Sequence, residues 1–132
     1  MKILGIETSC DETAVSVVEA GGEIDSPVFN LLSSAVNSQI EIHKEYGGVV
    51  PNIAKREHTK NLSIVLDEAL KKADVTSEQI DLIAVTVGPG LEPALWCGIT
   101  FAKEISEKWQ KPLIGVNHME GHIASVFLTN TK

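Results

Sequence analysis

One segment constrains the fold more than any other: residues 81–87 (DLIAVTV), an almost continuous apolar run. Such runs are typical of strands in parallel sheets, which are buried on both faces. The segment lies between two stretches with helical periodicity, 51–73 and 94–109. Parallel strands need crossover connections, which are usually helices and are almost always right-handed. The chain is therefore predicted to be an α/β protein.

The N-terminal part predicts three further strands. Residues 2–8 (KILGIET) and 13–20 (TAVSVVEA) are apolar or β-branched, and the polar connection 9–12 predicts a hairpin between them. A glycine pair at 21–22 predicts a turn, and a third strand is expected over 27–36.

The remaining segments complete the order βββαβαβα. Residues 37–50 have no clear period and predict a long loop, and 76–79 (TSEQ) fits a helical capping box. A fifth strand is expected over 112–116, and a last helix, capped by Asn117, over 118–128. We expect a mixed five-stranded sheet with helices on its faces, in one domain spanning 1–132.

Composition and charge exclude several classes of protein. The chain has 43% hydrophobic residues, too many for a disordered chain, and a net charge of −7, the wrong sign for a protein that binds nucleic acid unaided. No apolar window reaches the ~18 residues of a membrane helix. Cys10 and Cys97 are isolated, which favours a reducing cytoplasm and leaves a single disulfide open.

The turn at 7–13 (ETSCDET) carries three carboxylates and three hydroxyls. Backbone N–H groups in a tight turn can hold a phosphate, and carboxylates can bind a metal or act as a general base. The alternative is an ordinary solvated turn, since Asp, Ser and Thr are common there. A second candidate is the Gly88-Pro89-Gly90 break after a buried strand, where α/β proteins bind ligands; a plain connecting turn is the alternative.

His118 and His122 form the third candidate. Residues four apart on a helix face the same way, so their imidazoles could share one metal ion. The pattern is not that of the zinc proteases, because Met119 stands where their glutamate would be. Two ligands do not complete a site, and two unrelated surface histidines remain the alternative.

Basic residues around the start of helix 51–73 form a fourth candidate. They could contact phosphates, or they could simply be the solvated face of a helix. They are His43, Lys44, Lys55, Arg56, His58 and Lys60.

With these motifs in view, the chain resembles the N-terminal part of the tRNA threonylcarbamoyladenosine transferases, the TsaD family once labelled glycoprotein endopeptidases. The resemblance covers nearly the whole chain. It rests on five segments in order: GIETSCDET at 5–13, Ser38-Gln39 through GGVVP at 47–51, Arg56 with His58, GPGL at 88–91 and NHMEGH at 117–122.

The resemblance implies a single actin-like (ASKHA, ribonuclease H-like) lobe. The implied reaction moves a threonylcarbamoyl group from its adenylate to N6 of an adenosine next to the tRNA anticodon. Asp11 and Glu12 would be catalytic. The residues implied to face the phosphate or substrate are Thr8, Ser9, Gly88 and Gly90.

The same resemblance makes His118 and His122 two ligands of one divalent iron or zinc ion, with the third protein ligand, an aspartate, in a later segment that is not in this chain. Helices 51–73 and 94–109 would bind a TsaB-like paralogue. We expect an N-terminal lobe without the family's second lobe, inactive alone, cytoplasmic and homodimeric through the same two helices.

Other functions stay open at this point. A non-catalytic actin-like scaffold or partner subunit of the same tRNA-modification complex is the main alternative, and an ATP-handling lobe and a metalloprotease are weaker ones. The transferase hypothesis makes one geometric prediction. His118 and His122 should converge on one position, with Asp11 nearby across an open cleft.

Overall fold

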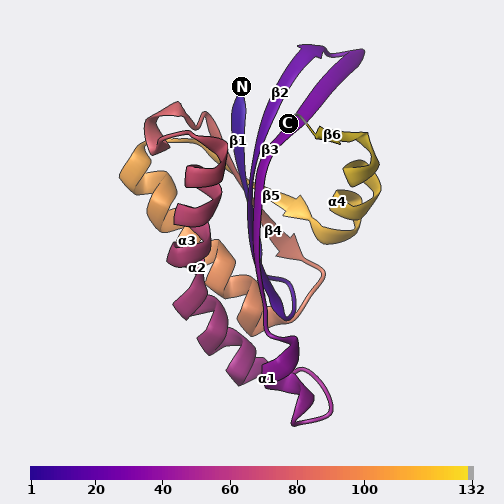
Figure 1. The fold of residues 1–132 in the computed structure, drawn as a ribbon, viewed down its shortest axis with the longest axis vertical. Helices are drawn as coiled ribbons and strands as arrows, with labels where there is room; N and C mark the ends of the chain where they lie inside the picture. Colours follow the sequence, from indigo (N-terminus) through magenta and orange to yellow (C-terminus); the bar gives the residue numbers. More distant parts are fainter. Residues whose placement is uncertain (131–132) are drawn as a thin grey trace.

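The computed structural model describes residues 1–130, which form one mixed sheet with helices on both faces (Figure 1). The strand order is β5-β4-β1-β2-β3-β6. The strands β1, β2 and β3 form an antiparallel meander. On the other side of β1, the strand β4 pairs in parallel with β1, and β5 pairs in parallel with β4. These strands are β1 (Lys2–Glu7), β2 (Glu12–Glu23), β3 (Ser26–Ser38), β4 (Leu82–Gly88) and β5 (Leu113–Asn117).

Two long helices, α2 (Pro51–Ala73) and α3 (Glu92–Trp109), cover one face of the sheet, and the short α4 (His118–Ala124) lies on the other (Figure 1). The hydrophobic core fills the space between the sheet and the two long helices, where alternate strand residues meet the apolar stripes of the helices. Its buried members include Leu4, Ile6, Val15, Val17, Leu62, Val65, Ile83, Val85, Ala102 and Ile105. The predicted α/β class and the five predicted strands are confirmed.

A sixth strand, β6 (Leu128–Asn130), pairs in parallel with the outer edge of β3. The predicted helix 118–128 is therefore too long: α4 ends at Ala124, and a single 3-10 turn, η2 (Ser125–Phe127), leads into β6. The bulky apolar residues after Ala124 fit a helical period but also favour a strand, and the open edge of β3 offers them hydrogen-bond partners.

Two other predictions need correction. The hairpin turn lies at residues 24–25 and not at the glycine pair, because Gly21 and Gly22 pair with Val28 and Pro27 inside the ladder. The predicted loop 37–50 contains a one-turn helix, α1 (Ile40–Lys44). A helix of five residues is too short to show a period in the sequence.

The short helices and caps follow the local sequence. The predicted capping box lies around η1 (Ser77–Gln79), where the N–H of Thr76 donates to Oε1 of Gln79 at 2.8 Å. Cys10 and Cys97 are both free thiols. None of the helices within residues 1–130 has the length and apolar character needed to cross a bilayer.

Candidate metal centre

The two histidines of α4 converge. Asn117 caps the helix as predicted, since its Oδ1 accepts from the N–H groups of Met119 and Glu120 at 2.9 and 3.1 Å. One helical turn then separates His118 from His122. Their Nε2 atoms lie 3.1 Å apart, and the rings meet edge to face at an interplanar angle of 87°.

This spacing fits two ligands of one metal ion. Nitrogen atoms bound to tetrahedral zinc at about 2.0–2.1 Å are separated by roughly 3.4 Å. The observed separation of 3.1 Å is close to that value. Within residues 1–130, no group of three His, Cys, Asp or Glu side chains is placed to hold a metal. The third protein ligand, expected in a later segment, stays a prediction.

A carboxylate lies directly behind the histidine pair. Glu7, the last residue of β1, has its Oε2 atom 3.1 Å from Nδ1 of His118. Oε2 also accepts from the hydroxyl of Thr86 on β4, and Oε1 accepts from the backbone N–H of Ser9. Burial raises the pKa of Glu7, but the hydrogen bonds from Ser9, Thr86 and His118 outweigh it and hold that pKa below its ordinary value. Glu7 is therefore a fixed, ionised acceptor at neutral pH.

The glycine-rich turn after β4 contacts the N-terminal hairpin. The Ser9 carbonyl accepts from the N–H of Leu91 at 2.8 Å, and a Cβ on Gly90 would lie 2.7 Å from the same oxygen. Only glycine allows this approach without a shift. Gly88, at the end of β4, has φ +153°. The side chain of Ser9 is buried, with Oγ 3.3 Å from Nδ1 of His118.

Thr8 is placed differently from Ser9. Its side chain is fully buried, and its hydroxyl donates to the carbonyl of Ala94 at the start of α3, at 2.8 Å. It also packs against Gly98, where a Cβ would collide with the hydroxyl. The hydroxyl of Thr8 therefore joins β1 to α3, and its position lends no support to the prediction that it faces a phosphate.

Two hollows flank the hairpin. The first, of about 330 Å³, contains the histidine pair, and its floor is the sheet face that α2 and α3 leave free. That floor consists of small side chains, which leave room for a ligand. They are Gly5, Ala14, Ser16, Ser34, Ala84 and Thr86.

Asp11 lines a second hollow, of about 350 Å³, together with residues of α1 and the loop after it, including His43 and Lys44. The carboxylate that reaches His118 is that of Glu7, not that of Asp11. Glu12 is exposed at the start of β2. The catalytic roles of Asp11 and Glu12 stay predictions.

The sequence hypothesis missed Glu7 as a distinct residue of the histidine site and missed the floor of small residues. One signal was available for both. Bulky apolar residues alternate with other residues along β1, with Leu4 and Ile6 on the core face and Gly5 and Glu7 on the other.

The predicted basic cluster is reduced by two members. His58 is fully buried: its Nε2 donates to the Cys10 carbonyl, and its Nδ1 lies 2.8 Å from the Thr13 hydroxyl. His43 is also buried and bonds Gln39. Both histidines therefore hold the fold together. The four basic residues that remain are exposed, which fits both a phosphate-contacting patch and a solvated helix face: Lys44, Lys55, Arg56 and Lys60.

Comparison with known proteins shows the family of the chain. Residues 30–132 match the family described as TsaD, tRNA N6-adenosine threonylcarbamoyltransferase. A protein of that name from Thermosipho melanesiensis is 54% identical over 129 residues, 98% of this chain. The chain belongs to the tRNA N6-adenosine threonylcarbamoyltransferase family.

A relative of the same name from Persephonella marina is 55% identical over 98% of this chain. The chain spans 37% of the length of the Thermosipho protein and 36% of that of the Persephonella protein.

Solved structures confirm the fold class. YeaZ from Pseudomonas aeruginosa superposes with a TM-score of 0.61 at 17% identity, covering 88% of this chain and 42% of its own. RuvC from Thermus thermophilus superposes with a TM-score of 0.58 at 14% identity, covering 94% and 66%. The sheet and its helices thus form a ribonuclease H-like lobe of the actin type, as predicted.

Proposed function

We propose that this chain is the N-terminal lobe of a metal-dependent transferase. The enzyme would move a threonylcarbamoyl group from its adenylate to N6 of an adenosine next to the tRNA anticodon. Family membership supports the reaction class. The observation that carries the metal site is the approach of the Nε2 atoms of His118 and His122 to 3.1 Å.

We assign metal-binding and substrate-contacting roles to separate residues. His118 and His122 would hold one divalent iron or zinc ion, with the third protein ligand outside this chain. Such an ion, when bound, supplies a Lewis acid that polarises the carbonyl of the adenylate. Ser9 and the turn at 88–90 would border the substrate, since they contact each other beside the histidines.

The chemical step is acyl transfer. The N6 nitrogen of adenosine bonds to the carbamoyl carbon, the bond from that carbon to the phosphate oxygen breaks, and AMP leaves. The amine loses one proton, which a carboxylate can accept. We assign that role to Asp11 or Glu12, at the tip of the hairpin that Glu7 and Ser9 anchor beside the metal site.

We place the partner surface on the helical side of the molecule, away from the histidine pair. A groove of about 640 Å³ runs between α2 and α3, lined by Trp96, Phe101 and Leu62 among others. Trp96 is half-exposed there. We assign this groove to a TsaB-like paralogue, and in its absence to a second copy of this chain. We also place the protein in the cytoplasm, in keeping with its two free thiols.

A chimera tests the transferase hypothesis. The chain replaces the matching N-terminal segment of the Thermosipho melanesiensis relative, to which it is 54% identical. We expect the chimera to modify tRNA in the presence of threonylcarbamoyl-adenylate and the chain alone to be inactive. A folded chimera that binds tRNA but transfers nothing would overturn the proposal.

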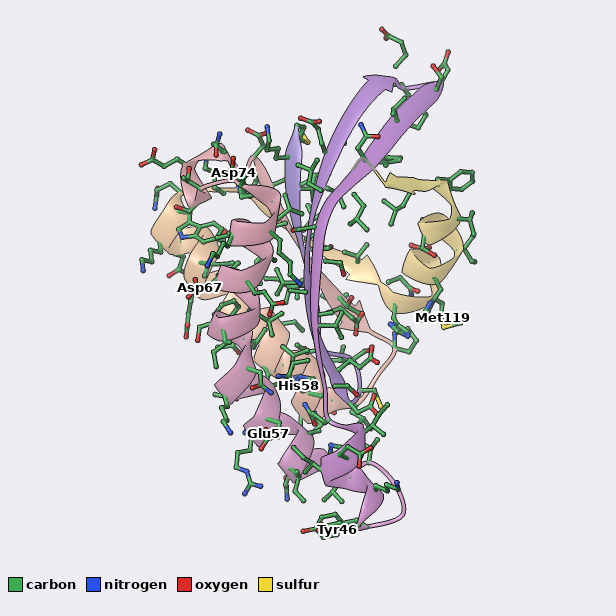
Figure 2. The ribbon with its side chains drawn as sticks, in the orientation of Figure 1. Tyr46, Glu57, His58, Asp67, Asp74 and Met119 are labelled. Atoms are coloured by element: carbon green, nitrogen blue, oxygen red, sulfur yellow. The ribbon has the colours of Figure 1, made fainter. Side chains whose placement is uncertain are left out.

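Zinc titration of the chimera by calorimetry tests the metal site separately, since the third ligand is expected outside this chain. We expect one ion to bind, and His118→Ala and His122→Ala each to weaken binding at least tenfold. Met119→Ala is the matched control, because Met119 lies between them on α4 and points outward (Figure 2). Equal affinity in all four proteins would remove the metal from the proposal.

The alternative, a non-catalytic scaffold or partner subunit of the same complex, has one observation in its favour. Within residues 1–130 the histidine pair has no third His, Cys, Asp or Glu side chain placed to complete a metal site. The chimera separates the two functions, since a scaffold would not carry out the transfer.

A further inference from the structure

We propose that Glu7 is a positioning residue that keeps the ring proton of His118 on Nδ1 and so leaves Nε2 free to bind a metal ion. The inference rests on the proposed function, in which His118 is a metal ligand. It assigns Glu7 a task that neither the fold nor the reaction class requires of it.

The hydrogen-bonding chemistry gives the direction of the contact. An ionised carboxylate accepts hydrogen bonds and cannot donate them. Oε2 of Glu7 lies 3.1 Å from Nδ1 of His118, so the contact is a hydrogen bond only when Nδ1 carries the proton. A neutral imidazole has one ring proton, and Nε2 is then a bare acceptor. A ligating histidine needs this state, with its other nitrogen bonded to a carboxylate or carbonyl.

The carboxylate is itself held in place from two directions. Ser9 donates its backbone N–H to Oε1 from the hairpin, and Thr86 donates its hydroxyl to Oε2 from the neighbouring strand β4. Thr86 is buried, and the side chains of Glu7 and His118 are only 33% and 27% exposed. Water therefore competes weakly for these bonds, and the orientation of the His118 ring is set by the sheet.

His122 differs from His118 in the ring nitrogen that carries the proton. With Nε2 of His118 bare, the 3.1 Å contact between the two Nε2 atoms requires His122 to donate its own Nε2 proton. A metal ion shared by both rings would displace that proton. Metal binding should thus change the protonated nitrogen of His122 and leave that of His118 unchanged.

Glu7→Gln tests the proposal, because glutamine keeps the shape but offers one oxygen and one NH₂ group. If the oxygen faces the N–H of Ser9, the NH₂ group faces Nδ1 of His118 and favours the Nε2–H tautomer. If the amide is reversed, its NH₂ group faces the backbone N–H of Ser9, and two donors then oppose each other without an acceptor. Thr86→Val is the matched control, since it removes a donor to Glu7 but leaves the acceptor of His118 in place.

The tautomers are read from long-range ¹⁵N–¹H spectra of the full chain labelled at histidine, and zinc affinity from calorimetry. We expect Nδ1–H at His118 in the wild type and in Thr86→Val, and Nε2–H in Glu7→Gln. Zinc affinity should fall by about 10- to 100-fold in Glu7→Gln. Because a histidine released to solvent also favours the Nε2–H form, circular dichroism first checks that Glu7→Gln is folded, and the Thr86→Val spectrum shows the tautomer in a folded protein that has lost a neighbouring hydrogen bond.

Two outcomes would overturn the proposed role of Glu7, and a third would overturn the metal site of the proposed function instead. A wild-type His118 in the Nε2–H form overturns the role of Glu7 without any variant. An unchanged tautomer and unchanged zinc affinity in Glu7→Gln do the same. If the tautomer changes but zinc binds equally to the wild type, Glu7→Gln and His118→Ala, the metal site of the proposed function fails and the hydrogen bond to Glu7 stands.

Discussion

Nδ1 of His58 lies 2.8 Å from the hydroxyl of Thr13, and Nε2 of the same ring lies 2.8 Å from the carbonyl oxygen of Cys10. A carbonyl only accepts, so Nε2 carries a proton, and in the neutral ring Nδ1 accepts from Thr13. His58 lies on the side of α2 that faces the sheet (Figure 2). One buried imidazole therefore fixes α2 to both ends of the acidic tip that contains Asp11 and Glu12.

Removing this ring should destabilise the chain. His58→Leu leaves the buried Thr13 hydroxyl without its partner, which costs about 1–3 kcal/mol, and removes the hydrogen bond to the partly buried Cys10 carbonyl, worth about 0.5–1.5 kcal/mol. We expect a loss of about 2–4 kcal/mol in the free energy of unfolding, measured with urea. Lys60→Leu, at an exposed position of the same helix, is the control and should change stability by less than ~0.5 kcal/mol. Equal losses in both variants would contradict the structure.

Stability should also depend on pH through His58. Burial lowers the pKa of His58 below its ordinary value of 6.5, so the unfolded chain takes up a proton before the folded chain does. The free energy of unfolding is therefore full above about pH 6.5 and falls as the pH drops below it. His58→Gln cannot titrate, and its urea midpoint should fall less than that of the wild type between about pH 7.5 and pH 5.5. Parallel declines would rule out this role.

Gly98 should not tolerate a side chain. A Cβ there would collide with the Thr8 hydroxyl inside the junction of β1 and α3. Overpacking costs about 1–3 kcal/mol, against a helix gain of about 0.5–1 kcal/mol from replacing glycine by alanine. Gly98→Ala should thus lower the melting temperature. Gly121→Ala, also helical but with open space around its Cβ, should raise it slightly.

Gly90→Ala should disturb the metal site from a distance. The added Cβ would press on the backbone and Cβ of Ser9, whose N–H is bonded to Glu7. We expect a several-fold loss of zinc affinity, because misplaced supporting residues weaken a metal site. Gly48→Ala adds its Cβ to open space and should leave the affinity unchanged. An unaffected Gly90→Ala would show that the turn and the site are independent.

The groove between α2 and α3 should drive self-association. Trp96 is 52% exposed within it, and large apolar surfaces of this kind mark interaction sites. Trp96→Glu should shift the chain toward monomer in sedimentation velocity runs. Ile24→Glu is the control, since Ile24 is 98% exposed at the tip of the β2–β3 hairpin, far along the sheet. A wild type that is monomeric at high concentration would remove the proposed homodimer.

The elements that could be predicted from the sequence are those with a local cause. The period of α2, the apolar run of β4 and the cap at Asn117 all depend on near neighbours in the chain. The strand β6 forms because the edge of β3, about a hundred residues earlier, offers partners, and no local pattern reports such an edge.

The same distinction between local and long-range causes applies to the candidate metal site. The spacing of His118 and His122 is helical geometry, so their convergence followed from the sequence. The contact of Glu7 with His118 depends on the order of strands in the sheet. The burial of His43 and His58 was missed because histidine is intermediate in its tendency to be buried, so residue type alone does not decide its place.

The alternation of side chains along β1 makes the hydrophobic core and the histidine site depend on the same strand register. Leu4 and Ile6 occupy the core face, and Gly5 and Glu7 face the histidines. A slip of one residue in the pairing of β1 would reverse both sets, bringing a carboxylate into the apolar interior and two large aliphatic groups over the binding floor. The register that buries Leu4 and Ile6 is thus the one that aims Glu7 at His118, so an error in strand pairing would cost the protein its core and its site together.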